Sequence, residues 1–243
     1  MTSTGASSST VELTTTAGAA RAELSGPAAA AFLLVLTHGS GGRTGTADVL
    51  AAAQAGRDLG AAVALVTQPF RVRGARAPGP APAQDAAWLE IIVALRSACP
   101  GVPLVQGGRS NGARVACRTA RDAGARAVLA LAFPVHPPGR PDKSRLDELR
   151  GAGCPVLAVS GDRDPFGNPA AADASRVVIL PGEGHALARR PAAVADAVRG
   201  WLSDVLGIRP AAVGKPLGRP AAGPSRRSSA AQVLKQQATA WPR

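Results

Sequence analysis

Cysteine is scarce in this chain of 243 residues. The three cysteines, Cys99, Cys117 and Cys154, are an odd number and include no C-x-x-C pair. This pattern disfavours a disulfide framework and a zinc site built from cysteine clusters. We therefore expect a reducing compartment, and we predict neither a metal ion nor another cofactor.

Long hydrophobic runs are also missing. The first apolar run, Ala28–Leu36, is too short to span a bilayer and too far into the chain for a signal peptide. We expect a cytoplasmic protein with no membrane partner. The hydrophobic content of 46% is enough for a sizeable core, which excludes a chain that is disordered throughout.

Acidic residues are few, 16 against 28 basic ones, and the formal net charge is +12. A strongly basic surface attracts phosphate polymers, so the location of this charge matters. Residues 207–243 contain seven basic residues and no acidic residue, so they carry +7 of the total. Their arginines are separated by proline and glycine, and only Trp241 offers a stacking ring, so we expect no nucleic-acid partner, with weak binding by this segment as the open alternative.

Composition divides the chain into three parts. Residues 207–243 have no apolar periodicity and cannot offset chain entropy by burial. We predict a disordered N-terminus at 1–9, a folded domain at 10–206 and a disordered basic tail at 207–243.

Within the predicted domain, apolar runs of strand length alternate with helical segments, which predicts a mostly parallel sheet covered by helices on both faces. Uninterrupted apolar runs indicate strands that are buried on both faces. The predicted strands are Phe32–Leu36, Ala61–Thr67, Val102–Gln106, Ala127–Ala132, Pro155–Ser160 and Arg176–Leu180, with one or two edge strands within Val11–Leu24. The predicted helices are Thr46–Leu59, Asp85–Ala98, Asn111–Ala123, Ser144–Arg150 and Pro191–Leu206.

The fold class is therefore an α/β three-layer sandwich with a sheet of about seven to eight strands. Two connections leave the carboxyl ends of strands, where open α/β sheets bind ligands. One is the loop Gln68–Gln84, and the other is Phe133–Lys143, which contains His136. Neither connection is long enough for a lid domain.

The sharpest local motif is Gly108-Arg109-Ser110-Asn111-Gly112, between a predicted strand and a predicted helix. A serine at a tight strand-to-helix turn needs small residues two positions away on either side. The following helix directs its N-terminus at the serine, which favours the anionic transition state of acyl transfer. A bare G-x-S-x-G also occurs by chance in glycine-rich chains, so the context carries the prediction of a nucleophile.

A nucleophilic serine needs a histidine base and an acid, in the chain order serine, acid, histidine for this type of fold. His185 is suitably placed downstream, in a glycine-containing loop after a strand, although such a histidine can also simply cap the next helix. Asp162 and Asp164 both follow the preceding strand. We prefer Asp164 as the acid and assign Asp162 to an Asx-type turn.

An oxyanion hole requires two backbone N–H groups. Asn111 follows the predicted nucleophile, and Ser40 lies in the glycine-rich run after the strand Phe32–Leu36. The competing interpretation of this run is a phosphate cradle. It lacks G-x-x-x-x-G-K-[ST], and the G-x-G-x-x-G pattern fails at Thr44, so nucleotide binding is disfavoured.

Five segments carry a family resemblance: Thr37-His38-Gly39, Gly108 to Gly112, Ala132 to Gly139, Gly161 to Gly167, and Gly184-His185. Together they resemble the α/β-hydrolase superfamily, and most closely a small lidless bacterial branch related to dienelactone hydrolases and to a hydrolase-like subunit of animal chromatin-acetylation complexes. The resemblance covers about residues 10–206. It implies an eight-stranded sheet truncated at its first strands and the triad Ser110, Asp164 and His185. Unlike dienelactone hydrolases, the chain has serine rather than cysteine at position 110.

Two functions from different classes follow. The first is a serine hydrolase that cleaves a small ester or thioester through an acyl-enzyme. Its candidate substrate-binding residues are Arg43, Arg109 and His136, and the loop arginines Arg71, Arg73 and Arg76 favour an anionic acyl group unless they are only solvated surface residues. The second is a catalytically silent interaction module, and nothing in the sequence fixes the oligomeric state.

Overall fold

Eight strands form one sheet in the computed structural model, which describes residues 9–208. Across the sheet the strand order is β1-β2-β4-β3-β5-β6-β7-β8. The pairs from β4 to β8 are parallel, whereas β1 and β2 are antiparallel to their neighbours. The strands are β1 (Ser9–Thr15), β2 (Gly18–Ser25), β3 (Phe32–Thr37), β4 (Ala61–Thr67), β5 (Leu104–Arg109), β6 (Ala127–Leu131), β7 (Val156–Gly161) and β8 (Arg176–Leu180).

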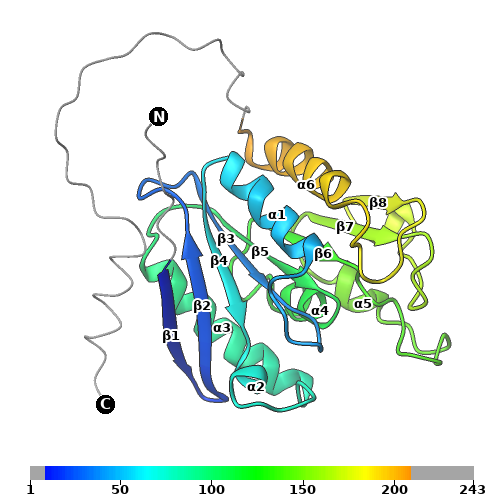
Figure 1. Cartoon of the computed structure of the whole chain (residues 1–243), viewed down its shortest axis with the longest axis horizontal. Coiled ribbons are helices and arrows are strands. Elements are labelled where there is room, and N and C mark those ends of the chain that lie inside the picture. The colour runs from blue at the N-terminus through cyan, green and yellow to red at the C-terminus, as the bar shows by residue number, and fades with distance from the viewer. Residues whose placement is uncertain (1–8, 209–243) are drawn as a thin grey trace, which may run out of the picture.

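Helices cover both faces of this sheet. They are α1 (Ala47–Asp58), α2 (Pro69–Val72), α3 (Ala81–Ser97), α4 (Asn111–Thr119), α5 (Leu146–Arg150) and α6 (Pro191–Leu206), with a 3₁₀ turn at Ala171–Asp173. Figure 1 shows α1 and α6 side by side over one face, and these two helices contact each other. The helices α3 and α4 also contact each other, on the opposite face.

The central strand β3 shows why two cores form. Successive strand residues point to opposite faces. Phe32 and Leu34 therefore join the core beneath α1 and α6, while Leu33 and Val35 join the core beneath α3. All of these side chains are nearly or fully buried, as expected for a strand that is covered on both sides.

The predicted fold class is confirmed: the chain forms a three-layer α/β/α sandwich with an eight-stranded, mostly parallel sheet and no lid domain within residues 9–208. The expectation of a sheet truncated at its first strands is wrong. Residues 9–25 form a hairpin whose second strand pairs with β4 and so completes the eight strands. The alternating pattern of exposed and buried residues in this hairpin matches strands with only one covered face.

Several element boundaries also differ from prediction, and two of them lie near the predicted ligand side of the sheet. The strand β5 runs to Arg109 rather than ending at Gln106, because Gly108 pairs with Thr37 of β3 and Arg109 pairs with Leu131 of β6. The predicted loop Gln68–Gln84 contains the short helix α2 and the first turn of α3. Proline in the first turn of each helix explains this, since its fixed φ suits a helix start.

No helix among residues 9–208 is long and apolar enough to cross a membrane. The three cysteines are free thiols. The predicted N-terminal segment 1–9 and the predicted tail 207–243 lie, apart from residues 9, 207 and 208, outside the described residues. The predicted division of the chain at these points stays a prediction.

Candidate active site

Ser110 occupies a sharp turn between β5 and α4. Its φ of 54° and ψ of −113° place it in a region that L-residues rarely adopt. Its backbone N–H donates to the carbonyl of Leu131, which ties the turn to β6. The hydroxyl does not cap the helix that follows, so it is available for another partner.

The two glycines that flank this serine are required by close backbone contacts. A Cβ on Gly108 would lie 2.7 Å from the carbonyl oxygen of Thr37, and one on Gly112 would lie 2.6 Å from that of His38. Both distances are shorter than real Cβ contacts allow. The glycines therefore let the turn pack directly against the segment that follows β3.

Ser110, His185 and Asp164 form a continuous hydrogen-bonded chain. The Oγ of Ser110 lies 2.9 Å from Nε2 of His185, and Nδ1 of His185 lies 2.8 Å from Oδ2 of Asp164. An ionised carboxylate can only accept, so the ring proton lies on Nδ1 and Nε2 is left to accept the serine proton. The structure thus brings together the three side chains that the sequence predicts as a triad.

Asp164 is held as a hydrogen-bond acceptor in a buried position. Its side chain is fully buried, and its Oδ1 accepts from the backbone N–H of Phe166 at 2.9 Å. The ring of Phe166 meets the imidazole of His185 edge-on, with centroids 4.5 Å apart. The exposed Asp162 instead accepts from the backbone N–H of Gly182 and does not contact His185. Of the two aspartates, the geometry favours Asp164 as the acid.

The two predicted oxyanion donors are the residue after the serine, Asn111, and a residue of the turn that follows β3, Ser40. Asn111 is the first residue of α4, where the N–H has no carbonyl acceptor within the helix. Gly39 lies against the serine, since a Cβ on it would be 3.1 Å from Cβ of Ser110. A bond from the N–H of Gly42 to the carbonyl of Gly39 closes a tight turn that contains Ser40. This arrangement is suitable for two donors beside the serine.

His38 fixes the chain just before this turn. It is fully buried, its Nδ1 lies 2.7 Å from the carbonyl oxygen of Gly39, and its Nε2 accepts from the backbone N–H of Gln68 at 3.0 Å. These bonds require the neutral tautomer with the proton on Nδ1. Burial lowers the pKa of His38, and the nearby Arg71 guanidinium lowers it further.

The three predicted substrate-binding residues lie in different surroundings. Arg43 is exposed, and no ion-pair partner for it lies within the described residues. His136 is half-buried, and its ring lies against Gly167 in the segment that follows Asp164. Arg109 does not extend into solvent, because it pairs with Asp48 and donates to the His185 carbonyl.

The three arginines of the loop Gln68–Gln84 also lie in different surroundings. Arg71 lies across Gly42, in the turn that contains Ser40, and its guanidinium is 3.5 Å from the carbonyl of Ala75. Arg73 donates to the carbonyl of Ala17 in the β1–β2 turn, whereas Arg76 is exposed. Only Arg71 therefore lies close to the predicted oxyanion turn.

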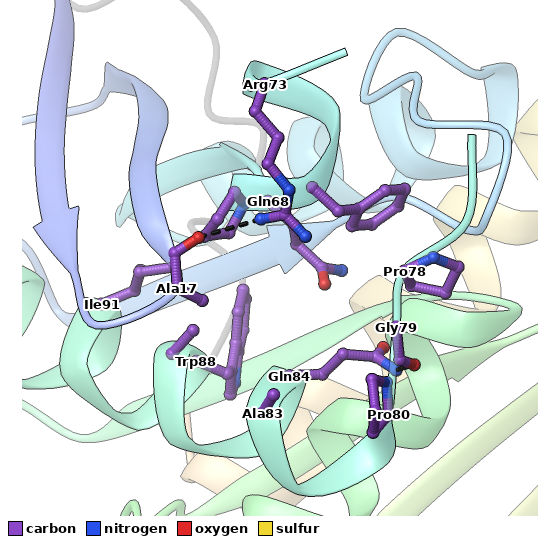
Figure 2. A pocket seen from close by; sticks show the side chains of 13 residues that line it. Ala17, Gln68, Arg73, Pro78, Gly79, Pro80, Ala83, Gln84, Trp88 and Ile91 are labelled. Carbon is purple, nitrogen blue, oxygen red and sulfur yellow. Dashed lines mark hydrogen bonds between the residues drawn. The ribbon is translucent and has the colours of Figure 1, made fainter. Parts of the chain in front are cut away.

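A pocket lies on the α3 side of the sheet, against the first turns of that helix (Figure 2). It encloses about 430 Å³, part of it open solvent, between the β1–β2 turn, the segment after β4 and the first turns of α3. Its wall is mostly apolar and includes Phe70, Trp88 and Ile91. The amide of Gln84 lines it and accepts from Nδ2 of Asn111 at 2.8 Å, so the pocket is one side chain away from the residue after Ser110.

Three residues of this site were not predicted from the sequence. Asp48 lies in the first turn of a helix, where acidic residues are common, so the sequence gives no indication of its ion pair. Glu183 is buried and accepts from the backbone N–H of Arg190, which braces the loop that carries His185. Gln84 gave no signal at all. Only the flanking glycines of Glu183 could have indicated a constrained loop.

Among residues 9–208, no group of three or more His, Cys, Asp or Glu side chains is arranged to hold a metal ion.

This sheet, with a serine at the turn after β5, a carboxylate after β7 and a histidine after β8, defines an α/β-hydrolase fold. Residues 30–188 match the family model of the alpha/beta hydrolase domain, and the chain belongs to this family. A comparison with curated proteins finds no match.

Solved structures share this fold at low sequence identity. A lidless α/β serine hydrolase from Xanthomonas campestris, XC6422, is 19% identical with a TM-score of 0.66, over 84% of this chain and 97% of that one. Est1E from Butyrivibrio proteoclasticus, solved with ferulic acid, is 16% identical with a TM-score of 0.68, over 81% and 99%. A dienelactone hydrolase from Anabaena variabilis is 19% identical with a TM-score of 0.65, over 82% and 98%. The chain is thus similar to small lidless members of the superfamily.

Proposed function

We propose that this protein is a serine hydrolase that cleaves a small carboxylic ester or thioester through an acyl-enzyme. The observation that carries the proposal is the hydrogen-bonded chain from Ser110 through His185 to Asp164, with distances of 2.9 and 2.8 Å. These are the distances at which a base takes a proton from its nucleophile. The esterase and serine hydrolase structures that share the fold are consistent with this chemistry.

In the first half-reaction, Oγ of Ser110 attacks the substrate carbonyl carbon while Nε2 of His185 takes the hydroxyl proton. The carbonyl π electrons move to its oxygen, and the N–H groups of Asn111 and Ser40 donate to the resulting oxyanion. The oxyanion then collapses and the bond to the leaving oxygen or sulfur breaks. The imidazolium of His185 gives its proton to the leaving group, and the acyl group stays on Ser110.

In the second half-reaction, water occupies the place of the leaving group. His185 takes a proton from this water as it attacks the acyl carbon, and the same two N–H groups stabilise the second oxyanion. When the bond to Oγ breaks, the proton returns to Ser110 and the carboxylic acid leaves. Asp164 holds the imidazole in one tautomer throughout and stabilises its positive charge.

The partner in this reaction is a small-molecule ester or thioester. The proposal requires no cofactor, nucleic acid or membrane, and the expected location is the cytoplasm. A catalytically silent interaction module remains the alternative function. It would be favoured if the three side chains lay too far apart to hydrogen-bond, which is not the geometry described above.

A fluorophosphonate reagent tests the nucleophile directly. It reacts with a serine hydroxyl only where a base activates that hydroxyl. We expect covalent labelling of the wild-type protein and none of Ser110→Ala, measured by intact-protein mass spectrometry. A folded wild-type protein that stays unlabelled would count against the enzyme and for the silent module.

The pocket beside Asn111 is assigned in this proposal to the apolar part of the substrate. Its apolar wall suits a hydrocarbon or aromatic group, and its few polar groups, the amides of Gln68 and Gln84 and the guanidinium of Arg73, suit orientation. Arg71, beside the oxyanion turn, remains the better candidate for an anionic group on the substrate.

A substitution on α3 tests this assignment. Ala83 lines the pocket, so Ala83→Trp should raise KM for esters with bulky acyl or alcohol groups by about tenfold, the effect of losing one or two methylene contacts. KM for a methyl acetate-sized ester should hardly change. Val93→Trp adds the same indole at an exposed position of α3 outside the pocket and serves as the control. Equal effects of both variants on all esters would contradict the assignment.

A further inference from the structure

Arg109 links three parts of the site through one guanidinium. It precedes Ser110 at the end of β5, and its Nη2 donates to the carbonyl oxygen of His185 at 2.7 Å. Its Nε lies 3.0 Å from Oδ2 of Asp48, in the first turn of α1. The residue before the nucleophile is therefore bonded to the backbone of the base and paired with the helix that follows the oxyanion turn.

Position 48 is an unusual place for a carboxylate. The Asp48 side chain is fully buried, and its one ion pair among residues 9–208 is with Arg109. Burial raises the pKa of Asp48, while the Thr46 hydroxyl and the Arg109 guanidinium offset part of this effect. A buried charge without a partner is costly, so Asp48 and Arg109 hold each other in place.

The loop that carries His185 needs such a restraint. Gly182 and Gly184 precede the histidine, and glycine leaves the backbone free to adopt many conformations. The triad works only if Nε2 stays within hydrogen-bonding distance of the Ser110 hydroxyl. A guanidinium is planar and donates in fixed directions, so it can hold a carbonyl oxygen and a carboxylate at the same time.

We propose that Arg109 is a positioning residue, which uses Asp48 as its anchor and holds the His185 backbone so that the imidazole faces Ser110. This inference rests on the proposed function and replaces the sequence-based expectation that Arg109 binds substrate. An arginine of the substrate-binding type would direct its free donors toward solvent, whereas the Arg109 side chain is 18% exposed, donates from Nη2 to the His185 carbonyl and forms an ion pair with Asp48.

Steady-state kinetics separate the two roles. Arg109→Gln should lower kcat about 10- to 100-fold, as a small misplacement of a catalytic group does, while KM stays within about twofold for neutral and anionic esters alike. Labelling by a small neutral fluorophosphonate should slow in parallel. Arg109→Lys should be intermediate, because one ammonium cannot hold both partners in the same geometry. A rise in KM confined to anionic esters, with kcat kept, would overturn the inference in favour of substrate binding.

Arg150→Gln is the matched control. Arg150 also pairs with a buried aspartate, Asp173, at 2.7 Å, and neither residue contacts the triad. We expect wild-type kinetics from this variant. If Arg150→Gln lowered kcat as much as Arg109→Gln does, removing any arginine paired with a buried aspartate would be sufficient to lower kcat. That result would overturn the inference.

Folding must be separated from positioning, because Arg109→Gln leaves Asp48 buried and unpaired. The double variant Asp48→Asn with Arg109→Gln removes that charge, so its thermal midpoint should return toward the wild-type value. Its kcat should remain as low as that of Arg109→Gln. Recovery of kcat together with stability would overturn the inference, because the effect would then act only through the fold.

A spectroscopic test does not depend on turnover. The chain has three histidines, and the His185 ring proton shared with Asp164 should give a far-downfield proton resonance that is absent in Asp164→Asn. This resonance should persist in Arg150→Gln and disappear in the double variant, whose histidine loop is released. Its persistence in the double variant would overturn the inference. A wild-type protein that shows the resonance but is neither labelled nor active would instead contradict the proposed function alone.

Discussion

At the scale of single residues, two aspartates of one loop lie in opposite surroundings although both follow β7. The Asp164 side chain is buried and bonds to His185 and to the backbone N–H of Phe166, whereas the Asp162 side chain is exposed and accepts from the backbone N–H of Gly182. The difference arises because Asp164 comes after the turn that is closed by its own N–H and the Gly161 carbonyl. Their neighbourhood in sequence therefore says little about their function.

Asparagine at each position provides a matched pair of variants. Asp164→Asn should lower kcat by about 10³- to 10⁴-fold, because an amide stabilises the wrong tautomer of His185 and leaves its charge unpaired. Asp162→Asn keeps the acceptor for Gly182 and should retain activity within about twofold. The measurement is kcat/KM on a small ester. If Asp162→Asn lowered kcat/KM more than Asp164→Asn does, the assignment of Asp164 as the acid would be wrong.

At the scale of elements, the sequence carries most of the fold because strand and helix patterns are local. The uninterrupted apolar runs predict the six parallel strands β3 to β8 and the burial of β3 to β7. The expected burial of β8 on both faces is wrong, because β8 lies at the edge of the sheet and only Leu180 in it is buried. The end of β5 was missed, since glycine has low strand propensity and only pairing with β3 and β6 places Gly108 in the strand. The hairpin at residues 9–25 was predicted only as one or two edge strands, since one-sided burial gives a weaker signal.

The candidate site divides in the same way. A strand, a turn and a helix surround Ser110 in sequence, so the serine, aspartate and histidine could be predicted from motifs and chain order. The structure brings them within hydrogen-bonding distance, and their catalytic roles stay a prediction. The pairs Arg109 with Asp48 and Asn111 with Gln84 could not be predicted, because each partner lies on a helix whose orientation is set only by packing.

The turn after β3 should respond to pH through His38. Its pKa is lowered in the native state, so below about pH 6.5 the unfolded chain binds a proton that the native state does not. The free energy of unfolding should therefore fall as the pH drops from 7 to 5, with a contribution from this residue of at most about 1.4 kcal/mol per pH unit. Protonation would place a second ring N–H against the N–H of Gln68.

Urea unfolding at several pH values can isolate this contribution. His38→Gln keeps an acceptor for the Gln68 N–H and should be less stable at pH 7, but its stability should change less steeply between pH 7 and 5 than that of the wild type. The difference between the two slopes cancels the titration of other groups. Identical slopes would mean that His38 is protonated as easily in the folded as in the unfolded chain.

At the scale of the whole molecule, the topology explains why residues distant in sequence meet. The parallel strands β3, β5, β7 and β8 all end at the same edge of the sheet, and the segments after them carry Ser40, Ser110, Asp164 and His185. Buried strands hold these segments at fixed distances, so the site is supported by the two cores rather than by the loops themselves.

Of the net charge of +12, the segment beyond Ile208 carries +7, outside the described residues. The helix α6 ends within the described residues: Gly207 adopts a left-handed conformation, and the N–H of Ile208 bonds to the Ser203 carbonyl. Ile208 also packs against the core beneath α1 and α6. Contacts within residues 9–208 therefore stabilise the end of α6.

A chain that stops after Ile208 should therefore have a free energy of unfolding within about 0.5 kcal/mol of that of the 243-residue chain. Both chains should have the same kcat/KM for a small ester. Chemical unfolding and ester hydrolysis of the two chains provide the comparison. Because the basic residues beyond Ile208 are sparse and have only Trp241 as an aromatic neighbour, neither chain should bind DNA in a salt-sensitive manner. Salt-sensitive DNA binding by the 243-residue chain but not by the truncated one would show that the basic residues beyond Ile208 bind nucleic acid. A loss of activity on truncation would show that residues beyond Ile208 are needed for hydrolysis.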